Sequence, residues 1–190
     1  MKILIACEFS GTVRNAFRKR GHDAWSCDLL PAEDQSEYHI QGDVREILDD
    51  GWDMMIAHPP CTYLCNSGVR WLHEKLGRWE KLKEAAEFFR ILINAPIDRI
   101  CIENPIPHRY AVELIGRKYD QLVQPWMFGA RESKATCFWL KNLPPLKPLI
   151  TEKPENVRQR IWKLPPSPER WKERSRTYPE IARAMAEQWG

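Results

Sequence analysis

Trp52-Asp-Met-Met-Ile-Ala-His-Pro-Pro-Cys61 is the stretch from which the architecture of this chain can be deduced. A short apolar run that follows an acidic residue is typical of a strand buried on both faces of a sheet. The two prolines fix φ and remove two backbone donors, so the strand must end there. Cys61 then lies on a loop at the end of a rigid strand, which is the usual place for a reactive side chain.

Six other segments have the same strand character, and helix signals separate most of them. The seven expected strands are residues 2–8, 22–28, 38–44, 52–58, 99–103, 121–128 and 136–140. The expected helices are residues 12–20, 72–94, 108–116 and 179–189. This alternation predicts an α/β fold with a doubly wound, mostly parallel, seven-stranded sheet, in which the last two strands run antiparallel to each other.

Length and composition indicate one globular domain over residues 1–190, with a proline-rich, basic arm at about 142–175. Residues 153–176 hold 8 Lys and Arg against 3 Glu, whereas residues 1–60 hold 6 against 11 Asp and Glu. A basic segment of this kind suits a polyanion such as nucleic acid, and it suits a solvated surface loop equally well. Trp162 and Trp171 stand among its cations, where they could stack on bases or anchor the arm to the domain.

The cysteines and the N-terminus suggest a cytoplasmic protein with no membrane partner. No run of 18 apolar residues exists, and the first residues turn acidic too soon for a signal peptide. The six cysteines are therefore expected to be reduced thiols. Four of them stand inside apolar strands and are expected to be buried and inert, namely Cys7, Cys27, Cys101 and Cys137.

The ends of the first three strands carry groups that suit an adenosine-bearing cofactor. Phe9-Ser-Gly11 leads into a helix, Asp28 could accept from ribose hydroxyls, and Asp43 could accept from an adenine amino group. Each acid alone could equally be a helix cap or a solvated turn. Val13 and Ala16 replace the glycines of a dinucleotide fingerprint, which favours S-adenosylmethionine, a cofactor without phosphate. The expected cofactor-binding residues are Phe9, Gly11, Thr12, Asp28, Leu29, Asp43, Val44 and Pro59.

Two further strand ends carry a thiol and a carboxyl group that could act together on a base. Cys61 follows one strand, and Glu103 ends the next, in Arg99-Ile-Cys-Ile-Glu103-Asn-Pro105. A free thiol titrates near ~8.5, so Cys61 would need a helix onset or nearby cations to ionise at neutral pH. Partial burial would raise the pKa of Glu103 and allow it to share a proton with a ring nitrogen. The alternative is a carboxylate that accepts backbone N–H bonds in a turn.

The order of these motifs resembles that of cytosine-C5 DNA methyltransferases, particularly their short, phage-type members. The likeness extends over residues 2–140, and residues 176–189 resemble the closing helix of that family. It implies a Rossmann-like class I S-adenosylmethionine-dependent methyltransferase fold. By resemblance, Cys61 adds to C6 of a flipped cytosine, Glu103 protonates N3, and C5 then takes the methyl group. The DNA-facing residues expected on this basis are Pro60, Ser67, Asn104, Arg174 and Arg176.

The chain departs from the family pattern at several positions. Val13 stands where the family has the second glycine of Phe-x-Gly-x-Gly. Thr136 stands where the family has the arginine that contacts the cytosine O2. Lys134, or Arg131 out of register, could substitute as a catalytic cation. The family's target recognition domain is missing, so sequence specificity could be low or supplied by a protein partner. We expect the chain itself to be a monomer.

Other functions remain open from the sequence. An amino-methyltransferase would need an acid or amide before Pro59-Pro60, where His58 stands. An enzyme that modifies the C5 of a free pyrimidine nucleotide fits the small size, and a catalytically degenerate nucleic-acid-binding module fits the departures. A zinc site built on Cys61, Cys65 and His73 has a spacing that matches no common finger, so no metal is expected.

Overall fold

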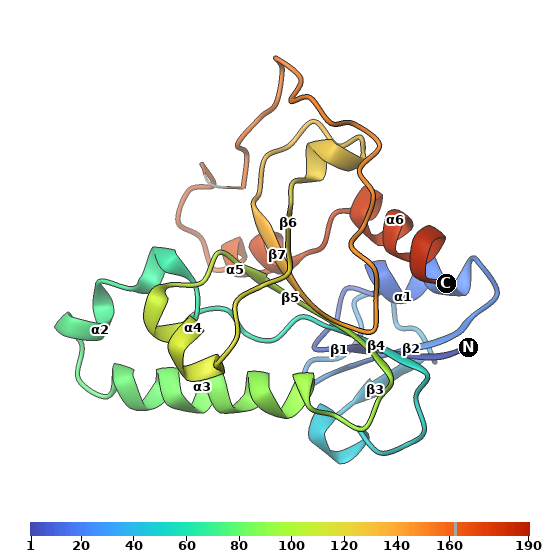
Figure 1. Cartoon of the computed structure of the whole chain (residues 1–190), viewed down its shortest axis with the longest axis horizontal. Coiled ribbons are helices and arrows are strands. Elements are labelled where there is room, and N and C mark those ends of the chain that lie inside the picture. The colour runs from blue at the N-terminus through green and yellow to red at the C-terminus, as the bar shows by residue number, and fades with distance from the viewer. Residues whose placement is uncertain (162) are drawn as a thin grey trace.

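A mixed seven-stranded sheet forms the centre of the computed structural model, which describes residues 1–161 and 163–190. The strand order is β3-β2-β1-β4-β5-β7-β6 (Figure 1). The strands are β1 Lys2–Ala6, β2 Asp23–Asp28, β3 His39–Gln41, β4 Met54–Ala57, β5 Arg99–Pro105, β6 Gln121–Val123 and β7 Thr136–Lys141. The first five strands pair in parallel, and β7 is antiparallel to both β5 and β6. The predicted fold class and the antiparallel final pair are confirmed.

Helices cover both faces of this sheet (Figure 1). One face packs against α1 (Thr12–Arg18) and α6 (Pro179–Trp189), and the other against α3 (Arg78–Ile93) and α4 (Arg109–Ile115). The apolar run in β1 explains how both faces are filled. Ile3 and Ile5 belong to the α1–α6 core, while Leu4 and Ala6 belong to the α3–α4 core, and all four are fully buried.

The predicted helix over residues 72–94 is wrong at residues 75–77, where it is interrupted. The structure contains a one-turn helix, α2 (Trp71–Glu74), and α3 begins only at Arg78. Lys75 is extended and Gly77 has φ 75°, a left-handed conformation that interrupts a right-handed helix. The spacing of Leu76 within this range fits the apolar face of a helix, but its side chain is fully exposed.

The expected strand over residues 121–128 is also wrong beyond Val123. Pro125 has no N–H to donate to a strand ladder, and the chain instead forms a 3-10 turn, η3 (Pro125–Phe128). Two further 3-10 turns are η1 (Val44–Glu46) and η2 (Asn66–Gly68). β1 ends one residue before Cys7, which has φ 58° and therefore leaves the strand direction.

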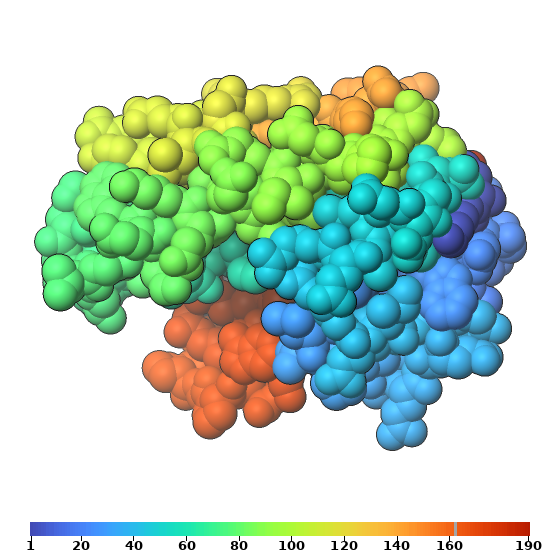
Figure 2. Space-filling model, turned by 90° about the horizontal axis from the view of Figure 1, so that it is seen from below, coloured from blue at the N-terminus to red at the C-terminus, as the bar shows by residue number. Residues whose placement is uncertain are grey.

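The arm at 142–175 is mostly irregular and ends in one short helix, α5 (Arg170–Ser175), which the sequence did not predict. In the space-filling view, the orange part of the arm stands apart from the green segment and lies against the blue N-terminal residues (Figure 2). In the part of the chain that the structure describes, no helix is long and apolar enough to span a bilayer.

Candidate active site

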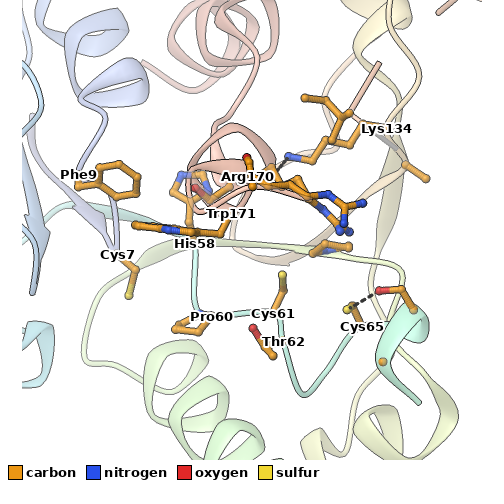
Figure 3. Close-up of a pocket in the computed structure, with 18 of the residues that line it drawn as sticks. Cys7, Phe9, His58, Pro60, Cys61, Thr62, Cys65, Lys134, Arg170 and Trp171 are labelled. Atoms are coloured by element: carbon orange, nitrogen blue, oxygen red, sulfur yellow. Dashed lines mark hydrogen bonds between the residues drawn. The ribbon is translucent and has the colours of Figure 1, made fainter. Parts of the chain in front are cut away.

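A cavity of about 1080 Å³ opens where β1, β2, β4 and β5 end. Figure 3 shows Cys7 and Phe9 toward one end of this cavity, Cys65 toward the other, and Cys61 between them. The predicted site residues that line it are Phe9, Asp28, Pro60, Cys61, Ser67, Lys134 and Arg174. The sequence thus placed groups from both halves of the expected site on a single cavity, as the strand-end rule for doubly wound sheets requires.

The loop after β4 holds Cys61 in a tight turn. Pro59 is buried, Pro60 is exposed, and the carbonyl of Cys61 accepts from the backbone N–H groups of Leu64 and Cys65 at 3.1 and 3.0 Å. The turn places Cys65 one helical turn after Cys61, and both side chains line the cavity. The rigid prolines and this turn fix the position of the Cys61 thiol.

The two thiols interact, which the sequence did not reveal. Contact with Cys65, burial and the Glu103 charge raise the pKa of the Cys61 thiol, although the Lys134 charge opposes this. The hydrogen bond from Cys61 lowers the pKa of Cys65, and bonds from Ser67 and nearby amides add to this effect. The Sγ of Cys65 lies 3.1 Å from the Oγ of Ser67. The structure therefore favours a Cys61 thiol that donates to a Cys65 thiolate, not the isolated Cys61 thiolate that we expected.

Glu103 is held by His58, the residue that stands where an amino-methyltransferase would need an acid or amide. Nδ1 of His58 lies 3.1 Å from Oε2 of Glu103, and the two side chains are only 8% and 12% exposed. Burial raises the pKa of Glu103, but the hydrogen bond from His58 and the charges of Lys134 and His58 outweigh it, so the pKa is lowered overall. This direction is opposite to our expectation of a raised pKa. The missed signal was the position of His58 at the end of a buried strand beside Glu103.

Lys134 supplies a cation to the cavity. Its Nζ donates to the backbone carbonyls of Arg174 at 2.8 Å and Arg176 at 3.2 Å, which ties the arm to the approach of β7. Thr136 is buried and its hydroxyl donates to the Lys134 carbonyl, so it cannot take the place of an arginine in the cavity. Arg131 is exposed and is not among the cavity-lining residues, so the structure does not support it as the substitute.

The helix end beside Phe9 is already occupied. Glu8 is buried, and its carboxylate accepts from the backbone N–H groups of Val13 at 2.7 Å and Arg14 at 3.1 Å. We expected these amides to face a ligand, but they are satisfied within the chain. A phosphate would have to displace this carboxylate, whereas an uncharged nucleoside would not.

The two acids expected to bind the cofactor, Asp28 and Asp43, differ in whether the carboxylate is available to a ligand. Asp28 lines the cavity, and burial raises the pKa of its carboxyl group although the amide of Leu30 donates to Oδ1. Asp43 instead caps η1 and forms an ion pair with Arg45, so it plays the helix-cap role that was the alternative. Asp28 therefore remains the better placed acceptor for a bound nucleoside.

The other expected cofactor-binding residues mostly serve local structure. Gly11 has φ 70°, and a Cβ there would clash with the guanidinium of Arg14. Thr12 bonds to the hydroxyl of Ser10, Val44 is buried in the core, and Leu29 projects into solvent with 71% of its surface exposed. Because their side chains are engaged or turned away, these residues shape the loops around the cavity and do not line it.

The arm forms one wall of the cavity. The ring of Trp171 lies 5.6 Å from that of Phe9, at an interplanar angle of 49°, and Arg170 and Arg174 line the same wall (Figure 3). Arg176 is held outside the lining by a bond to both carboxylate oxygens of Glu33 at 2.8 Å. Trp162, the other arm tryptophan, lies outside the described residues.

Several buried polar atoms near the cavity have no hydrogen-bond partner within residues 1–161 and 163–190. They include Nε2 of His58, Nε of Arg78 and Nε of Arg170, all on cavity-lining side chains, and both amide atoms of the buried Asn104. A polar atom left unpaired in a buried place is costly, so a ligand that supplies partners would be favoured there. Across the described residues, no group of three or more His, Cys, Asp and Glu side chains could share a metal ion.

Comparisons with known proteins agree with this fold. The chain is similar to a solved candidate DNA modification methyltransferase encoded within a prophage (E. coli), with a TM-score of 0.53 and 17% identity over 86% of this chain and 55% of that one. An Entamoeba histolytica methyltransferase, EhMeth, overlaps it with a TM-score of 0.47 and 14% identity over 81% of this chain and 57% of that one. The chain therefore spans little more than half the length of either structure.

No protein family model matches the chain, and no curated protein matches it either. The seven-stranded mixed sheet with its covering helices has the Rossmann-like fold of class I methyltransferases.

Proposed function

We propose that this chain is an S-adenosylmethionine-dependent methyltransferase that acts on C5 of cytosine in DNA through a covalent bond from Cys61 to C6. The observation that carries the proposal is the meeting of Cys61, His58 and Lys134 at one cavity, with Glu103 bonded to His58 just outside the lining. Attack of a thiolate at C6 builds negative charge on the ring, and an acid at N3 with a nearby cation relieves that charge. C5 then becomes the nucleophile.

The cofactor would occupy the other end of the cavity. Phe9 and Trp171 offer two aromatic surfaces for a purine ring, and Asp28 offers a carboxylate for ribose hydroxyls. The Glu8 carboxylate at the start of α1 disfavours a phosphate-bearing ligand, which is consistent with S-adenosylmethionine. When bound, that cofactor would supply the methyl group.

DNA is the proposed partner because the wall of the cavity is basic. Arg78, Arg170 and Arg174 line it together with Lys134, so a phosphodiester backbone would meet positive charge on its approach. In the cytosine-C5 DNA methyltransferases that the sequence resembles, a target recognition domain stands at the position of the arm. We therefore propose that this chain has a weak sequence preference or that a partner protein supplies the sequence specificity.

Trapping with a fluorinated base tests this proposal. DNA that contains 5-fluorocytosine, incubated with labelled S-adenosylmethionine, should yield a labelled adduct at Cys61, because fluorine at C5 blocks release of the enzyme. Mass spectrometry of the digested complex identifies both the base and the residue. Unmodified DNA and Cys61→Ala serve as controls. Labelled N4-methylcytosine without an adduct would support an amino-methyltransferase, and adduct formation with free 5-fluorodeoxycytidine monophosphate alone would support a nucleotide-modifying enzyme.

A further inference from the structure

His58 has a fixed position at the end of β4. It follows β4 directly, its backbone N–H donates to the Ala6 carbonyl at 2.9 Å, and two prolines follow it. These constraints fix the imidazole beside the cavity, which it helps to line. The side chain is only 8% exposed, so its ring is held between the cavity and the protein interior.

The two ring nitrogens of His58 differ in their surroundings. Nδ1 meets Oε2 of Glu103 at 3.1 Å, whereas Nε2 is buried without a partner among the described residues. The carboxylate therefore holds the ring in one orientation and fixes which nitrogen faces it.

The proposed reaction demands a proton that Glu103 alone is poorly suited to supply. The lowered pKa of Glu103 means that it is a carboxylate near neutral pH, and a carboxylate accepts hydrogen bonds but cannot donate one to N3. Other charged or titratable groups face the pair from neighbouring elements. They are Cys61 from the loop after β4, Lys134 from the approach to β7, and Cys101 and Cys137 from within β5 and β7. Cys65, Arg170 and Arg174 line the same cavity as His58.

We propose that His58 is the positioning residue of Glu103 and holds the proton that Glu103 passes to the base. This inference rests on the proposed function. As the sulfur–C6 bond forms, the Cys61 proton moves to the Cys65 thiolate, the Nδ1 proton of the His58 imidazolium moves to the Glu103 carboxylate, and the carboxyl proton moves to N3. The C5=C6 π pair becomes the C4=C5 bond, and the C4=N3 π pair binds the proton at N3. After C5 has taken the methyl group, the C5 hydrogen leaves as a proton to water, and its electron pair forms the C5=C6 bond as the C6–S bond breaks. Cys61 then recovers its proton from Cys65, and N3 returns its proton to the His58–Glu103 pair, so one proton is released for each methyl group transferred.

Two variants of His58 separate positioning from proton storage. Asparagine in His58→Asn can place an N–H near the Nδ1 position but cannot carry the extra proton, whereas His58→Ala removes both functions. We expect His58→Asn to bind DNA and cofactor normally and to lose about 100-fold in kcat at neutral pH. Its kcat should recover as the pH is lowered, because Glu103 then protonates directly. His58→Ala should be slower still, and the exposed His73→Asn should match the unsubstituted protein.

The outcomes distinguish this inference from the proposed function. The exchange of the cytosine C5 hydrogen with solvent, measured without methyl donor, reports addition at C6 alone and should fall in parallel with kcat. If the unsubstituted protein transfers methyl groups and His58→Asn keeps both its rate and its pH profile, the proton-storage role is wrong. If the unsubstituted protein is inactive, the proposed function fails. The His58–Glu103 hydrogen bond can then still be tested by NMR. A downfield Nδ1–H resonance of His58 that Glu103→Ala does not alter would refute this hydrogen bond.

Discussion

The ends of β1 and β3 form one edge of the site region and the ends of β4 and β5 form the other, and the two edges use their polar groups in opposite ways. Where β1 and β3 end, carboxylates are consumed by local structure: Glu8 closes the start of α1, and Asp43 caps η1 and pairs with Arg45. Where β4 and β5 end, polar atoms are left over, notably Nε2 of His58 and the amide of Asn104. Polar groups with hydrogen-bond partners inside the protein keep the site rigid, whereas polar groups without such partners gain hydrogen bonds when a substrate binds. The second edge is therefore where we expect substitutions to affect chemistry most.

The largest effect should come from the two cysteines at the reactive edge. Cys61→Ala should reduce methyl transfer by at least about 10⁴-fold, since the nucleophile is lost, while Cys65→Ser should reduce it by only about 10-fold. Rates with labelled S-adenosylmethionine measure both. Equal losses in the two variants would show that the thiols act as a unit and that Cys61 has no special part.

The thiols also provide a test that needs no substrate. Because contact with Cys61 lowers the pKa of Cys65, one thiol should be alkylated by iodoacetamide well below the pH at which free cysteine reacts. Peptide mapping should place this early label on Cys65. In Cys61→Ala the same label should shift to higher pH.

A smaller effect is expected at the opposite edge, where Asp28 is the residue to test and Asp43 is its control. Asp28→Asn should weaken binding of S-adenosylmethionine by about 10-fold, because Asp28 lines the cavity and a charge-assisted hydrogen bond is lost. Asp43→Asn should leave binding nearly unchanged, since that carboxylate is already engaged with Arg45. Calorimetric titration compares them. A greater loss at Asp43 would reverse our assignment of the two acids.

The smallest effect concerns stability and pH. The folded-state pKa of Glu103 is lowered, so its ionised form stabilises the fold; this contribution is complete above the unfolded value near ~4.5 and is lost as the pH falls through the folded value. Urea denaturation of the unsubstituted protein should therefore lose stability on the order of 1 kcal/mol more than Glu103→Gln between about pH 5 and pH 3. Parallel curves for both proteins would contradict this reading of the ion pair.

The sequence predicted the sheet well because burial on both faces leaves a clear pattern. The apolar runs of β1 and β4 and the proline stop after Ala57 correspond closely to the observed strands. Helical periodicity failed at Leu76, where spacing alone could not show that Gly77 interrupts the helix. The strand predicted at 121–128 ends early because Pro125 has no N–H for the strand ladder and begins a 3-10 turn.

The sequence predicted individual residues of the site but not the contacts between their side chains. Cys61 and Glu103 could be found because strand ends of a doubly wound sheet meet at one edge. The partners that change their acidity, Cys65 and His58, depend on side-chain directions in a loop and across two strands, which no linear pattern encodes. Trp171 likewise reaches Phe9 across more than 160 positions of sequence, through an arm without regular structure.

The carboxylate of Glu8 at the start of α1 affects which adenosine compounds in a cell can compete with the proposed cofactor for its binding site. ATP and dinucleotides share the adenosine unit of the proposed cofactor and are abundant, and a purine-binding cleft risks being filled by them. A fixed negative charge, held by two amides that such ligands would need, repels their phosphates by like-charge contact. Adenosine derivatives that carry a neutral or cationic substituent at the 5′ position should therefore be better starting points for inhibitors than any nucleotide.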